Sequence, residues 1–135
     1  MATAPDFAAW AVPDLVIPLG GRTYTVRPPS VGAMGKLLAC AVLGEVNLGI
    51  VDGPIPDEVQ AILDTIGPDE HPALGDAYEQ MVADGVHPTT IDRMAYYAVF
   101  FWTRGKEYAD TLAAVLWSPR ELGEESEAEA APKGS

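Results

Sequence analysis

The segment TIDRMAYYAVFFW, from Thr90 to Trp102, decides the fold because it is the longest nearly uninterrupted apolar run in the chain. Apolar side chains recur in it with the i, i+3, i+4, i+7 spacing of one helical face, namely Ile91, Met94, Ala95, Ala98, Phe101 and Trp102. Tyr97 and Phe100 widen this face, so we expect neighbouring elements to cover the helix on more than one side. The rest of the chain is expected to pack around this helix.

Residues at both ends of this segment predict where the helix begins and stops. Thr89 or Thr90 is the expected N-cap, and Asp92 lies near the positive end of the helix dipole. Arg104 lies at the negative end, and Gly105 supplies the left-handed residue that ends the helix. The segment therefore predicts one long, buried, aromatic helix.

The clearest β pattern is DLVIPLGGRTYTVR, from Asp14 to Arg27. Two runs of β-favouring residues flank Gly20-Gly21, a two-residue loop that can take the positive φ angles of a tight hairpin turn. Pro18 lacks an amide hydrogen, which favours a strand at the edge of a sheet. Because a lone two-stranded sheet is marginally stable in water, the hairpin is expected to pack on the helices or to join the sheet of another chain.

Four further apolar stripes predict helices around the central one. They run from Val31 to Val42 after the N-cap Ser30, from Val59 to Ile66, from Leu74 to Val82 and from Tyr108 to Leu116. Glycines are expected to end the first three, at Gly44, Gly67 and Gly85. The sequence thus predicts a mainly α fold, in which an N-terminal two-stranded hairpin precedes about five helices in one compact domain.

The predicted domain spans residues 14–121, with a different composition on each side of it. Residues 1–13 are rich in alanine and proline and predict a flexible arm that carries Phe7 and Trp10. Residues 122–135 have no large apolar side chain after Leu122, so they cannot bury enough surface to order, and we predict a disordered acidic tail.

Charge and cysteine content limit the classes of partner and compartment. Twenty acidic and eight basic residues give a net charge of −12, which argues against nucleic-acid binding and steers the chain towards basic partners. Cys40 is the only cysteine, so no intramolecular disulfide forms and a reducing cytoplasm is the expected setting. No stretch reaches the roughly 18 apolar residues of a membrane-spanning helix, so we predict no membrane association.

No residue pattern in the chain predicts catalysis. Cys40, His71 and His87 lack ligand-like spacing to further His, Cys or carboxylate groups, so no metal is expected. Gly32 to Lys36 resembles a phosphate loop only loosely, since its first glycine spacing is wrong and Leu37 replaces the Ser or Thr. We therefore predict a protein that is not an enzyme, with no catalytic residue and no cofactor.

The order of hairpin, Pro-Pro-Ser cap, helices and an aromatic helix ending in Trp-Thr-x-Gly resembles the tail assembly chaperones of siphophages that infect actinobacteria. The resemblance extends over Asp14 to Trp117 and is carried by DLVIPLGGRTYTV (14–26), PPS (28–30), YEQMVADGV (78–86), FWTRG (101–105), Ala109 and Trp117. It implies the short chaperone encoded upstream of the tape measure protein. Members of that family are not enzymes; they bind the long, helix-rich tape measure chain and keep it soluble while the tail tube assembles.

The resemblance also implies partners and a compartment. The tape measure protein is the expected client, meaning the chain that is kept soluble, and a frameshifted longer form of the chaperone and self-association are further possible partners. The chain is expected in the host cytoplasm and not in the mature virion. We predict that the exposed parts of two helical stripes and two glycines form the partner surface, made of Val31, Gly32, Met34, Gly35, Leu37, Leu38, Val59, Ile62 and Leu63.

Two other functions remain open at this point. The first is a structural virion component, such as a connector or a tail accessory subunit, that assembles through the edge strand Leu15 to Leu19. The second is an acidic decoy for a DNA-binding protein, for which carboxylates should follow one face, whereas here they are scattered over helix starts and loops. Presence in the finished particle distinguishes the structural component from a chaperone.

Overall fold

The computed structural model describes residues 1–117, so the predicted acidic tail 122–135 and the predicted end of the domain lie outside the described residues. Along the chain the elements are the 3-10 helix η1 (Phe7–Ala9), β1 (Leu15–Leu19), β2 (Arg22–Val26), α1 (Val31–Asn47), α2 (Asp57–Leu63), α3 (Ala77–Ala83), α4 (Pro88–Arg104) and α5 (Lys106–Trp117). The predicted mainly α fold, a hairpin followed by five helices, is confirmed. No helix in this part of the chain combines the length and the apolar character needed to cross a membrane.

The hairpin has the predicted turn, and one of its faces is buried. Leu19 pairs with Arg22 across Gly20-Gly21, and Gly20 has a φ of 62°. Pro18 lies opposite Thr23, in a strand that has no second partner among the described residues. Side chains of one face enter the core, namely Leu15, Tyr24 and Val26. The predicted packing of the hairpin on the helices is confirmed by its contact with α3.

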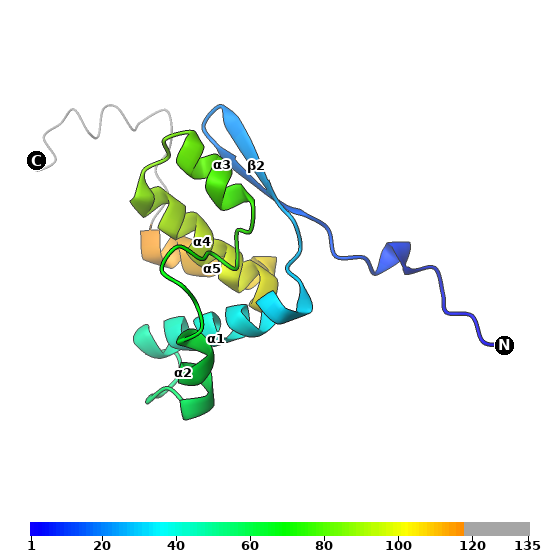
Figure 1. The fold of residues 1–135 in the computed structure, drawn as a ribbon, viewed down its shortest axis with the longest axis horizontal. Coiled ribbons are helices and arrows are strands. Elements are labelled where there is room, and N and C mark those ends of the chain that lie inside the picture. The colour runs from blue at the N-terminus through cyan, green and yellow to red at the C-terminus, as the bar shows by residue number, and fades with distance from the viewer. Residues whose placement is uncertain (118–135) are drawn as a thin grey trace, which may run out of the picture.

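Polar contacts fix the hairpin on the end of α3. The Tyr24 hydroxyl donates a hydrogen bond to Oδ2 of Asp84 over 2.7 Å, and Arg22 lies 3.7 Å from the same carboxylate oxygen. In Figure 1 the hairpin stands beside α3, while α1 and α2 lie at the opposite end of the domain. Residues 1–14 are exposed and extend away from the helices.

Helix α4 is the centre of the domain, as predicted, and packs on both α1 and α5. Its buried side chains are Ile91, Met94, Ala98 and Phe100. The predicted N-cap at Thr89 or Thr90 is wrong, because the helix begins at Pro88 and His87 is the cap. Proline is favourable in the first turn, where its missing N–H costs no bond, and the His87 side chain accepts a hydrogen bond from the Thr89 amide over 3.1 Å. The predicted stop at Gly105, with a φ of 101°, is confirmed.

Helix α1 corrects a second boundary, since it continues through Gly44 to Asn47. Gly44 serves close packing and not termination. A Cβ atom at this position would lie 3.0 Å from the Tyr96 hydroxyl and 3.1 Å from Cζ of Phe100. Glycine therefore lets α1 approach the aromatic face of α4, and this packing outweighs the low helix propensity of the residue. The predicted Ser30 cap is confirmed by its hydrogen bond from the Ala33 amide.

Candidate partner-binding surface

The predicted partner residues of α1 divide between the surface and the core. Val31 and Leu38 are seven residues apart and share one face of the helix, where 92 % and 43 % of their surfaces are exposed. Gly32 and Gly35 have no atom within 4 Å of the Cβ position that a larger residue would occupy. These four residues form an open patch on α1.

Two predicted partner residues of α1 point away from that patch. Leu37 is fully buried in the core, and Met34 is half-buried against it. Successive residues of an α-helix are rotated by about 100°, so Leu37 and Leu38 cannot lie on the same face. Leu37 therefore cannot contact a partner in this structure, and its assignment to the partner surface is wrong.

Helix α2 carries the other predicted residues and has no buried side chain. Val59 and Leu63 are half-buried, whereas Ile62 is exposed. The helix packs on α1, so the structure does bring the two predicted stripes into one region of the domain. Its N-cap is Pro56, which makes no side-chain hydrogen bond, so α2 depends on its contact with α1.

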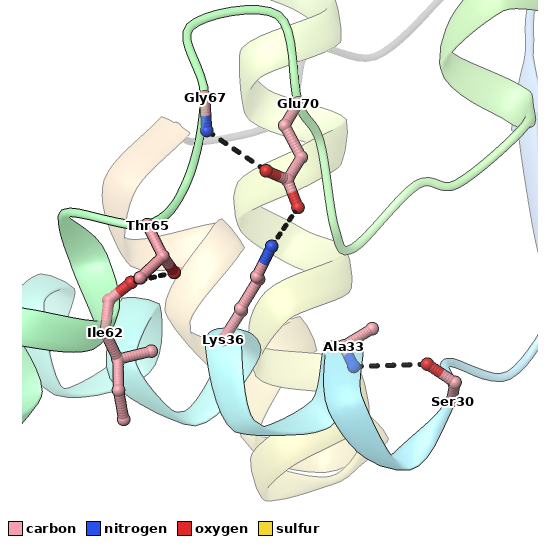
Figure 2. Close-up of polar contacts among 7 residues, drawn as sticks. All are labelled: Ser30, Ala33, Lys36, Ile62, Thr65, Gly67 and Glu70. Carbon is pink, nitrogen blue, oxygen red and sulfur yellow. Dashed lines mark hydrogen bonds and ion pairs between the residues drawn. The ribbon is translucent and has the colours of Figure 1, made fainter.

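A charged contact attaches the segment after α2 to α1. Figure 2 shows the Glu70 carboxylate between the Lys36 ammonium, at 2.5 Å, and the Gly67 amide, at 3.0 Å. The hydrogen bond from Lys36 lowers the pKa of Glu70, and the Gly67 amide lowers it further. Together these bonds hold the turn at 67–70 over the first half of α1.

A cavity that sequence reasoning missed lies under this segment, between α1 and α4. It has a volume of about 300 Å³, and its apolar lining includes Cys40, Leu43, Ile66, Pro72 and Val99. On α1 the lining residues recur with helical spacing and include two residues of the face that packs on α4; they are Leu37, Cys40, Leu43, Gly44 and Asn47. That spacing is visible in the sequence, but the residues that complete the cavity come from the 66–73 segment and from α4.

Two ionisable side chains of this cavity, Cys40 and Tyr96, favour their neutral forms. Burial raises the pKa of the Cys40 thiol, and the nearby Glu70 raises it further. Burial also raises the pKa of Tyr96, and the Glu45 carboxylate adds to the effect. A protonated thiol is a weak nucleophile, and the apolar lining of this cavity suits apolar groups.

A second cavity of about 270 Å³ adjoins the first, with His71 and Asp92 lining both. Val82 of α3 and Val86, in the segment after that helix, line it together with Ile91 of α4. The imidazole ring of His71 stacks on Tyr78, with ring centroids 4.0 Å apart. We call the two cavities together the His71 groove.

Charge is distributed unevenly around this groove. From residue 37 to residue 92 the chain has eleven acidic residues and no lysine or arginine. Both nearby cations are engaged: Lys36 pairs with Glu70, and the guanidinium of Arg93 lies 5.5 Å above the Trp117 ring. The groove and the surfaces of α2 and α3 therefore belong to an anionic part of the molecule.

The one buried charged residue among residues 1–117 has a structural explanation. Glu45 is 6 % exposed and accepts two hydrogen bonds from Arg104, both of 2.9 Å, and a third from the Tyr108 hydroxyl at 2.7 Å. The bonds from Arg104 are the main reason why the pKa of Glu45 is lowered. This cluster joins α1 to α4 and α5. Sequence reasoning missed it, although a glutamate in an apolar stretch was a visible signal.

The described residues contain no group of three His, Cys, Asp or Glu side chains arranged to hold a metal ion. His71 lies in the groove and His87 caps α4. Asp57 and Glu58 occupy the first turn of α2, where the helix dipole favours negative charge. Each sequence candidate for chemistry in this part of the chain thus has a packing or capping position.

Comparison with known protein families gives one match. A family model described as a domain of unknown function, DUF7426, matches residues 5–135, which is nearly the whole chain. The chain belongs to the DUF7426 family. The matched residues include the hairpin, the five helices of the described part of the chain and the His71 groove. No curated protein and no solved structure matches the chain.

Proposed function

We propose that this DUF7426 protein is a phage tail assembly chaperone that binds the helix-rich tape measure protein and keeps it soluble while the tail tube assembles. The observation that carries the proposal is the ordered set of sequence patterns between Asp14 and Trp117, from the hairpin to the Trp-Thr-x-Gly end of the aromatic helix. The protein acts in the host cytoplasm, without catalysis, and is absent from the mature virion.

The surface of the domain supports this proposal. A chaperone for an apolar helical client needs accessible apolar side chains and enough charge to stay soluble. Val31 and Leu38 on α1 and Ile62 on α2 are exposed, and the chain carries a net charge of −12. We place client contact on these residues with Gly32, Gly35 and the exposed edges of Val59 and Leu63.

Co-expression with the protein encoded immediately downstream tests the proposal. We expect the two chains to co-elute, and we expect the downstream protein to be soluble only when it is co-expressed with this chain. Leu38→Asp and Ile62→Asp should weaken co-elution, while Val115→Asp, at an exposed apolar residue of α5, serves as the matched control. A downstream protein that neither binds nor gains solubility would contradict the proposal.

A structural virion component is the second candidate, and the hairpin favours it. Strand β1 pairs only with β2 among the described residues, and Val16 on it is 54 % exposed. An unpaired strand edge can add to the sheet of a neighbouring subunit. Detection of the chain in purified particles at a fixed copy number would favour this candidate over the chaperone.

A further inference from the structure

We propose that the His71 groove binds a basic amphipathic helix, whose apolar side chains enter the two cavities and whose lysines or arginines face the surrounding carboxylates. The groove lies apart from the α1 and α2 residues named above for client contact. This inference deepens the proposed function by naming the chemistry of a client segment that binds in the groove, and it rests on that function only for the identity of the client.

The two cavities have the form that anchors a helix. Each has an apolar lining, with Leu43, Ile66 and Val99 in the first and Val82, Val86 and Ile91 in the second. Their shared residues His71 and Asp92 place them side by side. An amphipathic helix presents apolar side chains at i, i+3, i+4 and i+7, which can fill two neighbouring cavities from one face.

One wall of the groove is held in place before any partner binds. The turn that precedes His71 is fixed by two contacts of Glu70, one with the Lys36 ammonium and one with the Gly67 amide, and both are drawn in Figure 2. The indole N–H of Trp102 donates to the Ala73 carbonyl over 3.3 Å, on the other side of His71. A groove with a fixed wall loses little conformational freedom on binding.

Charge selects a basic partner over a neutral or acidic one. Asp92 lines both cavities, and within residues 1–117 no side chain forms a hydrogen bond or ion pair with it. The cations next to the groove, Lys36 and Arg93, are turned to Glu70 and Trp117. Because complementary charge raises association rates and excludes like-charged partners, a helix with a lysine-rich polar face fits this groove.

Two synthetic helical peptides test the inference directly on the full-length chain. They share the same leucines at i, i+3, i+4 and i+7, and one has a lysine-rich and the other a glutamate-rich polar face. Fluorescence anisotropy should show binding of the lysine peptide that weakens as salt is raised, and no binding of the glutamate peptide. Equal affinity for both peptides, or binding of neither, would overturn the inference.

Variants place the peptide on the groove. Val82 is 52 % exposed, so Val82→Asp should leave the fold intact and weaken binding of the lysine peptide about tenfold. Asp92→Asn should weaken it roughly threefold and reduce the salt dependence. Val115→Asp and Glu107→Gln on α5 are the matched controls, outside the groove, and should change nothing. Groove variants that behave like these controls would also overturn the inference.

The same variants separate this inference from the proposed function. If the downstream protein co-elutes with the wild-type chain and equally with Val82→Asp and Asp92→Asn, the chaperone proposal stands and the groove inference fails. If the lysine peptide binds in the groove but the downstream protein does not bind at all, the groove inference stands and the proposed client is wrong.

Discussion

Helix α1 packs on two neighbouring helices, and the two interfaces differ in burial and in charge. Towards α4 it presents Leu37, Ala41 and Gly44, all buried, and the buried Glu45 cluster lies at the end of this interface. Towards α2 it meets a seven-residue helix that has no buried residue and no side-chain cap. Helices this short are unstable without packing. Stability is therefore concentrated at the α1–α4 interface, while the α2 side keeps apolar side chains accessible to a partner.

The largest expected loss of stability comes from a substitution at the buried α1–α4 interface. Leu37→Ala should lower the free energy of unfolding by about 2–5 kcal/mol, because Leu37 is fully buried and its loss leaves a cavity. Leu38→Ala, one residue away on the exposed face, should change it by less than about 1 kcal/mol. Urea denaturation of both variants checks this pair, and equal losses would break the distinction between the two faces.

Glu45→Gln should have the next largest effect, about 2 kcal/mol, since it removes the charge from the bonds with Arg104 and leaves that guanidinium partly buried without its partner. Arg104→Ala in the same background reports the coupling between the two residues. A double-mutant cycle without coupling would mean that the cluster adds nothing to the α1–α4 interface.

The ionisation of Glu45 should make the free energy of unfolding depend on pH. The folded pKa of Glu45 lies below its ordinary value of 4.5, so its contribution is complete above that value and is lost as the pH falls through the lower, folded pKa. The stability difference between wild type and Glu45→Gln should therefore be smaller at pH 3 than at pH 7. Denaturation curves at the two pH values measure it, and a constant difference would contradict the assignment.

Alanine substitutions at two glycines of α1 should change stability by smaller amounts and in opposite directions. Gly44→Ala should destabilise the protein by about 1–3 kcal/mol, because its Cβ would press on Tyr96 and Phe100. Gly35→Ala meets open space, so the higher helix propensity of alanine should stabilise by roughly 0.5–1 kcal/mol. Thermal unfolding of both variants should give shifts of opposite sign, and shifts of the same sign would contradict the packing described for Gly44.

The smallest expected effect on stability is on α2. Ile62→Asp should change the free energy of unfolding by less than about 0.5 kcal/mol, since Ile62 lies on the exposed side of a helix without buried residues. Its effect on binding of the downstream protein should nevertheless be large. A variant that unfolds would show that α2 belongs to the stable part of the domain.

The elements with strong local patterns could be predicted from the sequence. The aromatic helix, the Gly20-Gly21 turn and the Ser30 cap each depend on neighbouring residues, and each is where the pattern placed it. The wrongly predicted helix ends have separate causes, and they include the stop at Gly67, since α2 already ends at Leu63. A glycine that ends a helix and a glycine that admits a close neighbour look alike in sequence, and His87 is an unusual N-cap that the more common threonines obscured.

The binding surface was less predictable because it depends on which helical face each neighbour covers. The apolar stripe of α1 was visible, but the sequence could not show that α4 covers Leu37 and leaves Leu38 exposed. The His71 groove requires residues from α1, the 66–73 segment, α3 and α4. Such a site arises from tertiary contacts, so no single stretch of the chain carries its signal.

Hydrogen exchange of the chain, alone and in complex with the co-expressed downstream protein, tests most directly whether stability and binding lie on different sides of α1. We expect the α4 amides to exchange slowly in both states. Amides of α2, residues 57–63, should exchange rapidly in the free chain and slowly in the complex. If residues 57–63 exchange as slowly as α4 in the free chain, or if the complex leaves them unchanged, the separation between the two sides is wrong.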